Sequence, residues 1–382
     1  MKRIISLFFV LLTVFTCFSP ISIYAEEQNI LHGEAKSVIL MEAVTGKVLY
    51  EHQADLRLPP ASVTKIMTIL LVVEALDKGN IKPEDIVQAS ERASKIGGSQ
   101  IYLKAGEEMT VNDLLKSVII ASANDAATAL AEHVCGSVEA FVQKMNERAV
   151  ELGMRSTSFE NPTGLDDTVK EHLTSARDIA IMSRELLKHE RILQYTTVWM
   201  DSIRNGAFGL TNTNRLIRFY KGANGLKTGY TSGAGFCISA TAERDGMQLI
   251  AVVMGSPTRD SRNETAKALL DHGFATYRYY CSPQKNVGSI RVKGGVANEC
   301  PLICMELSAV VKKEIYGDGI KVEINLPDSL IAPVKAGEAV GEAIFKCGDT
   351  VIGSAKIMAG STVKRISFGE ILVRLIGSYF YK

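Results

Sequence analysis

The order of strand-like and helical segments constrains the fold of this chain more than any other feature of its sequence. Strand-like runs cover 37–41, 47–50, 235–242 and 247–254, and helical patterns cover 62–77, 111–119, 124–135, 138–152, 176–187 and 264–274. Turn signals at Thr45-Gly46 and Asp245-Gly246 join the strands of each pair into hairpins. Because most of the helices separate the two pairs of strands, a shared sheet has to join distant parts of the chain. This order predicts one large, mixed α/β domain.

The last quarter of the chain has a different character. The chain has 382 residues, enough for more than one core. From Cys281 onward, short Val- and Ile-rich runs alternate with Gly, Pro and Asn/Asp turns, which is typical of a compact β sandwich over roughly 284–363. We therefore expect a leader at 1–25, a large domain at 26–283, a β-sandwich domain at 284–365 and a terminal helix at 366–382.

The first 25 residues have the layout of a secretory signal peptide. Lys2 and Arg3 precede an almost wholly apolar run over 4–14, and small and polar residues follow as far as Ala25. The alternative is an uncleaved signal anchor, and the abrupt polar turn that begins at Glu26 favours cleavage after Ala25. In either case we expect the body of the protein to lie outside the cytoplasmic membrane.

Composition excludes several classes of function. Apolar residues make up 46% of the chain and charged residues 22%, as in an ordinary soluble protein. The formal net charge is +1, without the basic excess that a nucleic-acid-binding face requires, so we expect no nucleic-acid partner. The 6 His and 7 Cys form neither an H-E-x-x-H motif nor paired C-x-x-C motifs. We therefore expect no metal site and no other cofactor.

The cysteines leave two alternatives open. Cys17 would leave with the signal peptide, and the even number that remains permits disulfides in an exported protein. Their density is far below that of a disulfide-stabilised scaffold. Cys300 and Cys304 lie four positions apart, which fits no common zinc spacing. Buried free thiols are the favoured interpretation.

Ser62-Val63-Thr64-Lys65 is the first of three short motifs that carry chemistry. An apolar helical pattern follows, so we expect Ser62 at the start of a helix, near free backbone N–H groups and the positive end of the helix dipole. Lys65 then lies one turn away on the same face. An amine whose pKa is lowered by burial or by a nearby cation can activate a serine hydroxyl. The spacing alone is weak support, because it recurs at Ser282/Lys285 and Ser361/Lys364.

Ser122-Ala123-Asn124 is the second motif, and it opens a predicted helix after an apolar run over 118–120. A serine at this place is also typical of a helix N-cap, which is the alternative interpretation. The same S-x-N spacing recurs at Ser261/Asn263, so this motif too is nonspecific alone.

Lys227-Thr228-Gly229 is the third motif, and it occurs once. A glycine inside a strand allows another backbone or a ligand to approach closely, while the lysine and threonine beside it offer a cation and a hydroxyl. The alternative interpretation is a turn-rich edge strand without a functional role.

The order of the three motifs is more specific than any one of them. S-x-N follows S-x-x-K by 60 residues and K-T-G follows 105 residues later, which is the order of penicillin-binding proteins and class A β-lactamases. Over nearly its whole length the sequence resembles the low-molecular-mass penicillin-binding proteins of the serine-type D-alanyl-D-alanine carboxypeptidase family. Val63 and Tyr230 are mild departures from the usual residues and bear on substrate preference. The matching segments are 45–50, 60–68, 122–126, 161–165 and 225–229.

The resemblance implies a fold and a reaction. The fold is a β-lactamase/transpeptidase-like domain with a central antiparallel sheet flanked by helices, followed by the β sandwich and an amphipathic helix. Ser62 would attack the carbonyl between the two terminal D-alanines of the cell-wall stem peptide, with Lys65 as its base. Ser122 would relay a proton to the departing D-alanine, and Asn124 would hold Lys65 and the substrate amide. Loss of the terminal D-alanine would limit cross-linking during cell-wall synthesis and remodelling.

The resemblance also implies binding roles. Backbone N–H groups of Ser62 and Tyr230 would form an oxyanion hole, in which each donor is worth about 3 kcal/mol. Lys227 and Thr228, together with Arg262, would bind the terminal carboxylate of the substrate. Gly229 and Tyr230 would belong to the same substrate-binding site. Water would then hydrolyse the acyl-enzyme. β-Lactam antibiotics present the same amide and carboxylate, so they should acylate Ser62.

Two other functions stay open at this point. A β-lactamase of the same fold would need a glutamate to activate the deacylating water. The region 158–166 offers Glu160 without the expected E-x-x-L-N pattern, and the added β domain also argues against this function. A cell-wall binding protein without catalysis is the other alternative, and the complete set of motifs opposes it.

The C-terminal segment from Phe368 has the pattern of an amphipathic helix. Phe368, Ile371, Leu372, Leu375, Ile376 and Tyr379 share one face, and Glu370, Arg374 and Ser378 share the other. A membrane-spanning helix needs about 20 apolar residues, so this one is expected to lie in the membrane interface, with Lys364 and Arg365 adding attraction to anionic lipids. A helix docked on the β domain is the alternative. We expect peripheral attachment to the outer face of the cytoplasmic membrane.

Overall fold

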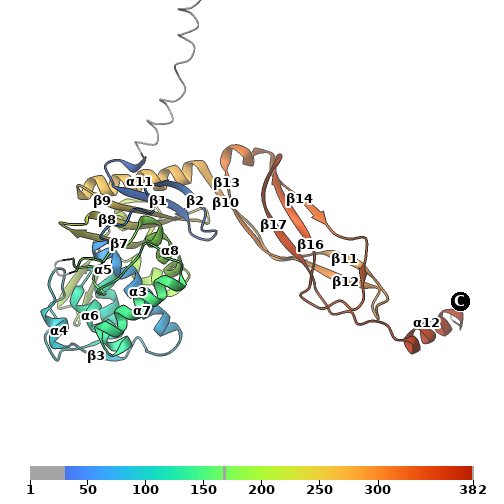
Figure 1. The fold of residues 1–382 in the computed structure, drawn as a ribbon, viewed down its shortest axis with the longest axis horizontal. Helices are drawn as coiled ribbons and strands as arrows, with labels where there is room; N and C mark the ends of the chain where they lie inside the picture. Colours follow the sequence, from blue (N-terminus) through green and yellow to red (C-terminus); the bar gives the residue numbers. More distant parts are fainter. Residues whose placement is uncertain (1–30, 167–168, 381–382) are drawn as a thin grey trace, which may run out of the picture. The chain divides into compact units, whose positions relative to one another are not determined.

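The computed structural model describes residues 31–166 and 169–380, and the expected signal peptide at 1–25 lies outside these ranges. The chain divides into two compact units, one ending at Gly273 and the other beginning at Phe274 (Figure 1). The division lies somewhat before the expected boundary at 283/284. The reason is that β10 (Tyr277–Ser282) pairs with β13 (Leu307–Lys312) and so belongs to the second unit.

A five-stranded antiparallel sheet organises the first unit, in the order β2-β1-β9-β8-β7. The pairing of β1 with β9, in which Leu40 lies opposite Ala251, joins the N-terminal hairpin to the later strands. The prediction that the sheet is assembled from distant parts of the chain is therefore confirmed. The strands are β1 (Ser37–Glu42), β2 (Val48–His52), β7 (Ala223–Thr231), β8 (Gly235–Arg244) and β9 (Met247–Ser256).

Alternating side chains give this sheet two buried faces. Ile39 and Met41 enter the main core, where α8 packs against the sheet. Leu40 and Leu249 point the other way and meet α11 (Arg259–Thr276) at Gly273, where an added Cβ would lie 2.5 Å from Leu249. Figure 1 shows α11 on one side of the sheet and the remaining long helices on the other.

Capping residues mark the ends of several helices of the middle segment. The hydroxyls of Thr110, Ser137 and Ser175 accept hydrogen bonds from backbone N–H groups in the first turns of α5, α7 and α8. Gly136, with φ 80°, ends α6 in the left-handed conformation. The helices are η1 (Ala61–Thr64), α3 (Lys65–Asp77), α4 (Glu91–Lys95), α5 (Val111–Ile120), α6 (Asn124–Cys135), α7 (Val138–Glu151) and α8 (Ala176–Leu187).

Shorter elements complete the first unit. Two hairpins stand apart from the main sheet, one formed by β3 and β4 and the other by β5 and β6. Their bounds, with those of the short helices, are β3 (Ile86–Gln88), β4 (Glu108–Thr110), η2 (Glu190–Ile192), α9 (Leu193–Thr196), β5 (Met200–Ile203), β6 (Phe208–Thr211) and α10 (Leu216–Phe219).

The second unit is a β domain with its own core. Its main sheet has six strands in the order β14-β16-β17-β12-β11-β15, and Leu302, Phe345 and Ile357 are buried in its core. Its further elements are β11 (Lys285–Lys293), β12 (Glu299–Cys304), η3 (Lys313–Asp318), β14 (Ile320–Asn325), β15 (Leu330–Ile331), β16 (Ala339–Cys347), β17 (Thr350–Ala359) and α12 (Phe368–Phe380).

The state of the cysteines and the character of the helices bear on the expectations above. The six cysteines of the described ranges are free thiols, and four of them, Cys237, Cys300, Cys304 and Cys347, are buried. Over residues 31–166 and 169–380, no helix has the length and apolar character needed to cross a bilayer.

Candidate active site

The K-T-G motif lies on β7, the edge strand of the sheet, directly beside the turn that carries Ser62. A Cβ added at Gly229 would lie 2.9 Å from both the Pro60 carbonyl oxygen and the Ser62 amide nitrogen. Any larger residue would push the two backbones apart. The close approach that a glycine in a strand permits is therefore used here to bring β7 against Ser62.

Ser62 and Lys65 face each other across one turn. Ser62 lies in the 3₁₀ turn η1, one turn before α3 rather than inside it, and α3 begins at Lys65. Lys65 Nζ lies 2.8 Å from Ser62 Oγ and donates to the Thr163 carbonyl oxygen, also at 2.8 Å. The two side chains are thus in direct contact, as their spacing predicts.

Burial favours the neutral form of the Lys65 amine. Its side chain is fully buried, and this desolvation, together with the charge of Lys227, holds its pKa well below the ordinary value of 10.5, although Asp125 opposes the shift. An unprotonated amine has a lone pair that can accept the proton of the neighbouring Ser62 hydroxyl.

A loop at 161–165 fixes the position of Lys65. The side-chain oxygen of Asn161 accepts hydrogen bonds from the backbone of Thr163 and Gly164, at 3.1 and 2.7 Å. Gly164 has a φ of 84° and packs so closely that an added Cβ would lie 1.8 Å from the Ala61 carbonyl oxygen. Sequence reasoning assigned this loop no role, because the group that contacts Lys65 is a backbone carbonyl that no residue type reveals.

His172 is a second residue that the sequence did not identify. Its ring contacts η1, with Nε2 2.8 Å from Thr64 Oγ1, and Nδ1 accepts a hydrogen bond from the Glu160 N–H at 3.0 Å. Burial lowers the pKa of His172 to about 4. The bond to Nδ1 therefore assigns the proton of the neutral ring to Nε2, which donates to Thr64. A lone histidine outside any motif gave no signal in the sequence.

Ser122 is not the N-cap of its helix. The N-cap of α6 is Ala123, which makes no side-chain capping bond, so the N-cap interpretation of Ser122 is wrong. Ser122 instead has a φ of 62° and lines the cleft described below while remaining 4% exposed.

Asn124 is held by the neighbouring loop. Its Nδ2 donates to the Gly97 carbonyl oxygen at 2.7 Å, and its Oδ1 is buried without a hydrogen-bond partner in the described ranges. Lys65 Nζ is bound to Ser62 and Thr163. The expected hydrogen bond between Asn124 and Lys65 is not formed between these described residues, and the buried Oδ1 leaves an acceptor for a substrate amide.

Two buried basic side chains lie at the other end of the site. Lys227 is 1% exposed, and burial together with Arg262 lowers its pKa to about 7. Its Nζ donates to the Thr228 carbonyl oxygen at 3.0 Å, and Thr228 Oγ1 donates to Thr213 Oγ1 at 2.9 Å. Arg262 is 3% exposed and donates to Asn263 Oδ1, and burial lowers its pKa to about 10.

These groups border one cleft of about 650 Å³. Six of the predicted site residues line it, namely Ser62, Ser122, Thr228, Gly229, Tyr230 and Arg262, while Lys65, Asn124 and Lys227 are buried. Sequence reasoning missed its other lining residues, which are Ser99, Trp199, Thr211, Asn212, Thr213, Arg215, Phe236 and Arg259.

The cleft favours an anionic ligand. Its lining carries three arginines, and no Asp or Glu is among the described residues that form it. The exposed Tyr230 ring stacks on Phe236, with 4.2 Å between the ring centroids, and forms part of the wall. A substrate that ends in a carboxylate fits this arrangement of charge.

Comparison with known proteins identifies the family of this chain. The family model described as D-alanyl-D-alanine carboxypeptidase matches residues 24–258, and the model of the C-terminal domain of penicillin-binding protein 5 matches residues 280–365. This chain belongs to the D-alanyl-D-alanine carboxypeptidase family. Among curated relatives, the D-alanyl-D-alanine carboxypeptidase DacF of Bacillus subtilis (strain 168) is 43% identical over 99% of both chains.

Solved structures agree with the family assignment. Penicillin-binding protein 5 of Haemophilus influenzae has a TM-score of 0.78 at 31% identity, covering 87% of this chain and 98% of that one. Penicillin-binding protein D2 of Listeria monocytogenes, solved in an ampicillin-bound form, has a TM-score of 0.58 at 32% identity and covers 63% of this chain and 98% of its own. The chain is therefore a serine-type D-alanyl-D-alanine carboxypeptidase with the penicillin-binding-protein fold that the resemblance implied.

The β-lactamase alternative has no structural support in this carboxypeptidase. Glu160 is exposed, and its contact with the site is a backbone N–H bound to His172. Lys65 Nζ is hydrogen-bonded to a hydroxyl and a carbonyl rather than to a carboxylate. In the described ranges, no group of three or more His, Cys, Asp or Glu side chains is arranged to hold a metal ion.

Proposed function

We propose that this carboxypeptidase removes the terminal D-alanine from peptidoglycan stem pentapeptides through an acyl-enzyme on Ser62. The observation that carries the proposal is the 2.8 Å contact between Ser62 Oγ and the buried Lys65 amine, at the edge of a cationic cleft. Lys65 takes the hydroxyl proton as Ser62 attacks the carbonyl between the two D-alanines.

The other site residues stabilise the negative charges of the oxyanion and the substrate carboxylate, and they assist the departure of D-alanine. Backbone N–H groups of Ser62 and Tyr230 stabilise the oxyanion of the tetrahedral intermediate, and Gly229 allows β7 to approach closely enough for this. Lys227, Thr228 and Arg262 bind the terminal carboxylate. Ser122 passes a proton to the departing D-alanine, and Asn124 orients the substrate amide.

Hydrolysis of the acyl-enzyme completes the cycle and leaves a stem tetrapeptide. A tetrapeptide cannot donate a terminal D-Ala-D-Ala bond, so the reaction limits cross-linking of the cell wall. β-Lactams enter the same cleft and acylate Ser62, which is consistent with the ampicillin-bound form of the Listeria relative.

The proposal includes attachment to the outer face of the cytoplasmic membrane after removal of residues 1–25. The apolar side chains of α12 are exposed, with Phe368 at 81% and Leu375 at 61%. On the opposite face, Arg374 donates to the Val296 carbonyl oxygen and to Asn298 of the β domain. These contacts leave the apolar face available to the membrane interface.

Mass spectrometry of muropeptides tests the function directly. Purified disaccharide pentapeptide is incubated with the mature enzyme and with the Ser62→Ala variant. We expect the wild type to convert pentapeptide to tetrapeptide with release of one D-alanine, and the variant to leave it intact. Unchanged pentapeptide in both reactions would refute the proposal.

A further inference from the structure

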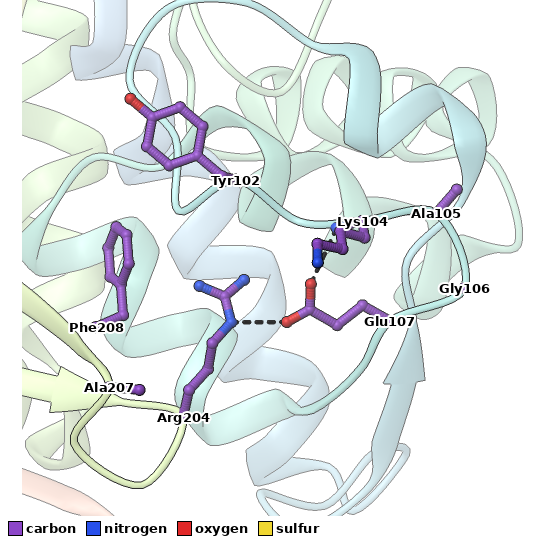
Figure 2. A pocket seen from close by; sticks show the side chains of 8 residues that line it. All are labelled: Tyr102, Lys104, Ala105, Gly106, Glu107, Arg204, Ala207 and Phe208. Atoms are coloured by element: carbon purple, nitrogen blue, oxygen red, sulfur yellow. Dashed lines mark hydrogen bonds and ion pairs between the residues drawn. The ribbon is translucent and has the colours of Figure 1, made fainter.

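The catalytic unit contains a second cavity, of about 690 Å³, separate from the cleft at Ser62. It lies between the segment that follows Ser99 and the turn of the β5–β6 hairpin. Both segments also reach the catalytic cleft, through Ser99 on one side and Thr211 on the other. The lining residues are Tyr102, Lys104, Ala105, Gly106, Glu107, Arg204, Ala207 and Phe208 (Figure 2).

Tyr102 presents its ring to solvent from a strained backbone. The residue is 70% exposed and has a φ of 58°, in the left-handed region that bulky residues rarely adopt. Its ring meets Phe208 edge to face at 6.4 Å, and the guanidinium of Arg204 lies 5.4 Å from the Phe208 ring centre. Core packing does not explain why a large aromatic ring is held in this exposed position.

The strained segment is fixed by the helix that carries the S-x-N motif. The carboxylate of Asp125, 1% exposed, accepts hydrogen bonds from the backbone N–H groups of Ile101 and Leu103, the two neighbours of Tyr102. Asp125 follows Asn124 directly in α6. The exposed ring is therefore positioned by the same helix end that positions Ser122 and Asn124.

The polar groups of the cavity are neutralised and fixed in place. Arg204 donates from Nε to Glu107 at 2.7 Å and from Nη1 to the Ile101 carbonyl oxygen at 2.8 Å, and the Lys104 N–H donates to the other Glu107 oxygen at 2.9 Å. Figure 2 shows this ion pair beside the two aromatic rings. An aromatic face next to a neutralised pair of donor and acceptor groups suits a ligand with an apolar face and hydroxyl or amide groups. A sugar ring has this chemistry.

The separation of the two cavities fits a substrate that joins peptide to sugar. Tyr102 lies three residues beyond Ser99, and Phe208 lies three residues before Thr211. Each connection therefore spans at most about 10 Å. Four stem residues precede the bond that Ser62 attacks, and an extended stretch of that length spans about 14 Å.

We propose that the cavity at Tyr102, Arg204 and Phe208 binds an N-acetylated amino sugar of the glycan strand that carries the stem peptide. This inference rests on the proposed function, since it places a second part of the same substrate. The aromatic rings contact the apolar face of the sugar, and Arg204 and Glu107 bind its polar substituents. The subsite makes the enzyme prefer glycan-attached pentapeptide over free pentapeptide.

The test compares D-alanine release from disaccharide pentapeptide and from the same pentapeptide without sugar. The main variant is Tyr102→Gly, because glycine relieves the left-handed backbone and keeps the protein folded. The value of kcat/KM for disaccharide pentapeptide, divided by that for free pentapeptide, should fall about tenfold in Tyr102→Gly. This is the effect of losing an aromatic contact of about 1.4 kcal/mol. The loss should appear in KM.

Two further variants separate a ligand role from a structural one. Tyr102→Phe keeps the ring and should keep the wild-type ratio. Met200→Ala removes a side chain that is 64% exposed on the same hairpin and does not line the cavity, so it should also keep this ratio. Tyr102→Gly should have an unfolding midpoint at or above that of the wild type. If the ring had a structural role, its loss would lower this midpoint.

Several outcomes would overturn the subsite. One is a folded Tyr102→Gly variant that keeps the wild-type ratio. Another is an equal fall in kcat/KM for both substrates, which would assign the cavity to the peptide. If the wild type released no D-alanine from either substrate, the proposed function would fail instead. NMR titration with the peptide-free disaccharide then still decides between the outcomes. Shifts at Phe208 that are present in the wild type and vanish in Tyr102→Gly support the subsite, and their absence in the wild type contradicts it.

Discussion

At the scale of single residues, two buried lysines set the chemistry of this site. Lys65 and Lys227 are both almost fully removed from solvent, and burial is the first cause of the lowered pKa of each. A buried ammonium is costly, so the fold favours the neutral amine. The same burial therefore supports the proposed base role of Lys65 and makes both lysines costly to protonate in the folded protein, and each consequence can be measured.

The base role of Lys65 predicts a dependence on pH. Its lowered pKa favours the neutral amine, so kcat/KM for D-alanine release should fall as the pH drops through this pKa and the amine gains a proton. Lys65→Arg should be about 10²- to 10⁴-fold slower, since a guanidinium does not lose its proton. Turnover of the variant near the wild-type rate would refute a lysine base.

The buried Lys227 predicts a dependence of stability on pH. Its pKa is about 7 in the folded protein against 10.5 for an unperturbed lysine. Between these values the unfolded chain binds the extra proton, so the free energy of unfolding should rise with pH by up to about 1.4 kcal/mol per unit. Lys227→Met should lack this contribution. Urea unfolding, followed by the fluorescence of Trp199 at several pH values, measures how the free energy of unfolding depends on pH in the wild type and in Lys227→Met. The same dependence in both proteins would contradict a lowered pKa of buried Lys227.

At the scale of elements, the contact between β7 and η1 brings together the residues of the proposed reaction site. An added Cβ at Gly229 meets backbone atoms of η1 at 2.9 to 3.0 Å, so Gly229→Ala should move Tyr230 away from Ser62 and disturb the oxyanion hole. We expect kcat to fall about 10²- to 10³-fold.

A matched strand glycine controls for the general effect of an added methyl group. Gly209 lies in β6 with nothing within 4 Å of an added Cβ, so Gly209→Ala should keep the wild-type kcat. Steady-state D-alanine release measures both variants. A Gly229→Ala enzyme with normal kcat would show that the close approach of β7 has no catalytic role.

Elements with local signals were predictable from the sequence. The predicted helices at 124–135 and 176–187 have the observed bounds, because a left-handed Gly136 and the N-cap Ser175 mark their ends. The β5–β6 hairpin was missed although its turn contains Asn205-Gly206, a common hairpin turn sequence, because each of its strands is only four residues long. The loop at 161–165 contacts Lys65 only because the tertiary fold brings it there.

At the scale of the whole molecule, the described catalytic groups all lie in the unit that ends at Gly273, and α12 lies in the other. Mature protein without residues 366–382 should therefore leave the membrane fraction and still cleave a small D-alanyl-D-alanine peptide at close to the full rate. Fractionation after confirmed signal cleavage, with a rate measurement on each fraction, checks this. A truncated enzyme that stays with the membrane would show that α12 is not the anchor.

The three motifs could be found in the sequence, but their meeting point could not be derived from it. Ser62, Ser122 and Lys227 lie far apart along the chain, and the pairing of β1 with β9 and β8 with β7 brings the third motif to the first. Their order together with the family resemblance predicted the site. Local spacing could not, because S-x-x-K also occurs at Ser282 and Ser361.

Covalent labelling of Ser62 tests the central claim most directly. Wild type, Ser62→Ala, Ser282→Ala and Ser361→Ala are incubated with a β-lactam, and intact-mass spectrometry with peptide mapping locates the adduct. We predict one adduct on the peptide that contains Ser62 in the wild type and in both control variants, and none in Ser62→Ala, which also releases no D-alanine. An adduct in folded Ser62→Ala would contradict the assignment of Ser62 as the nucleophile.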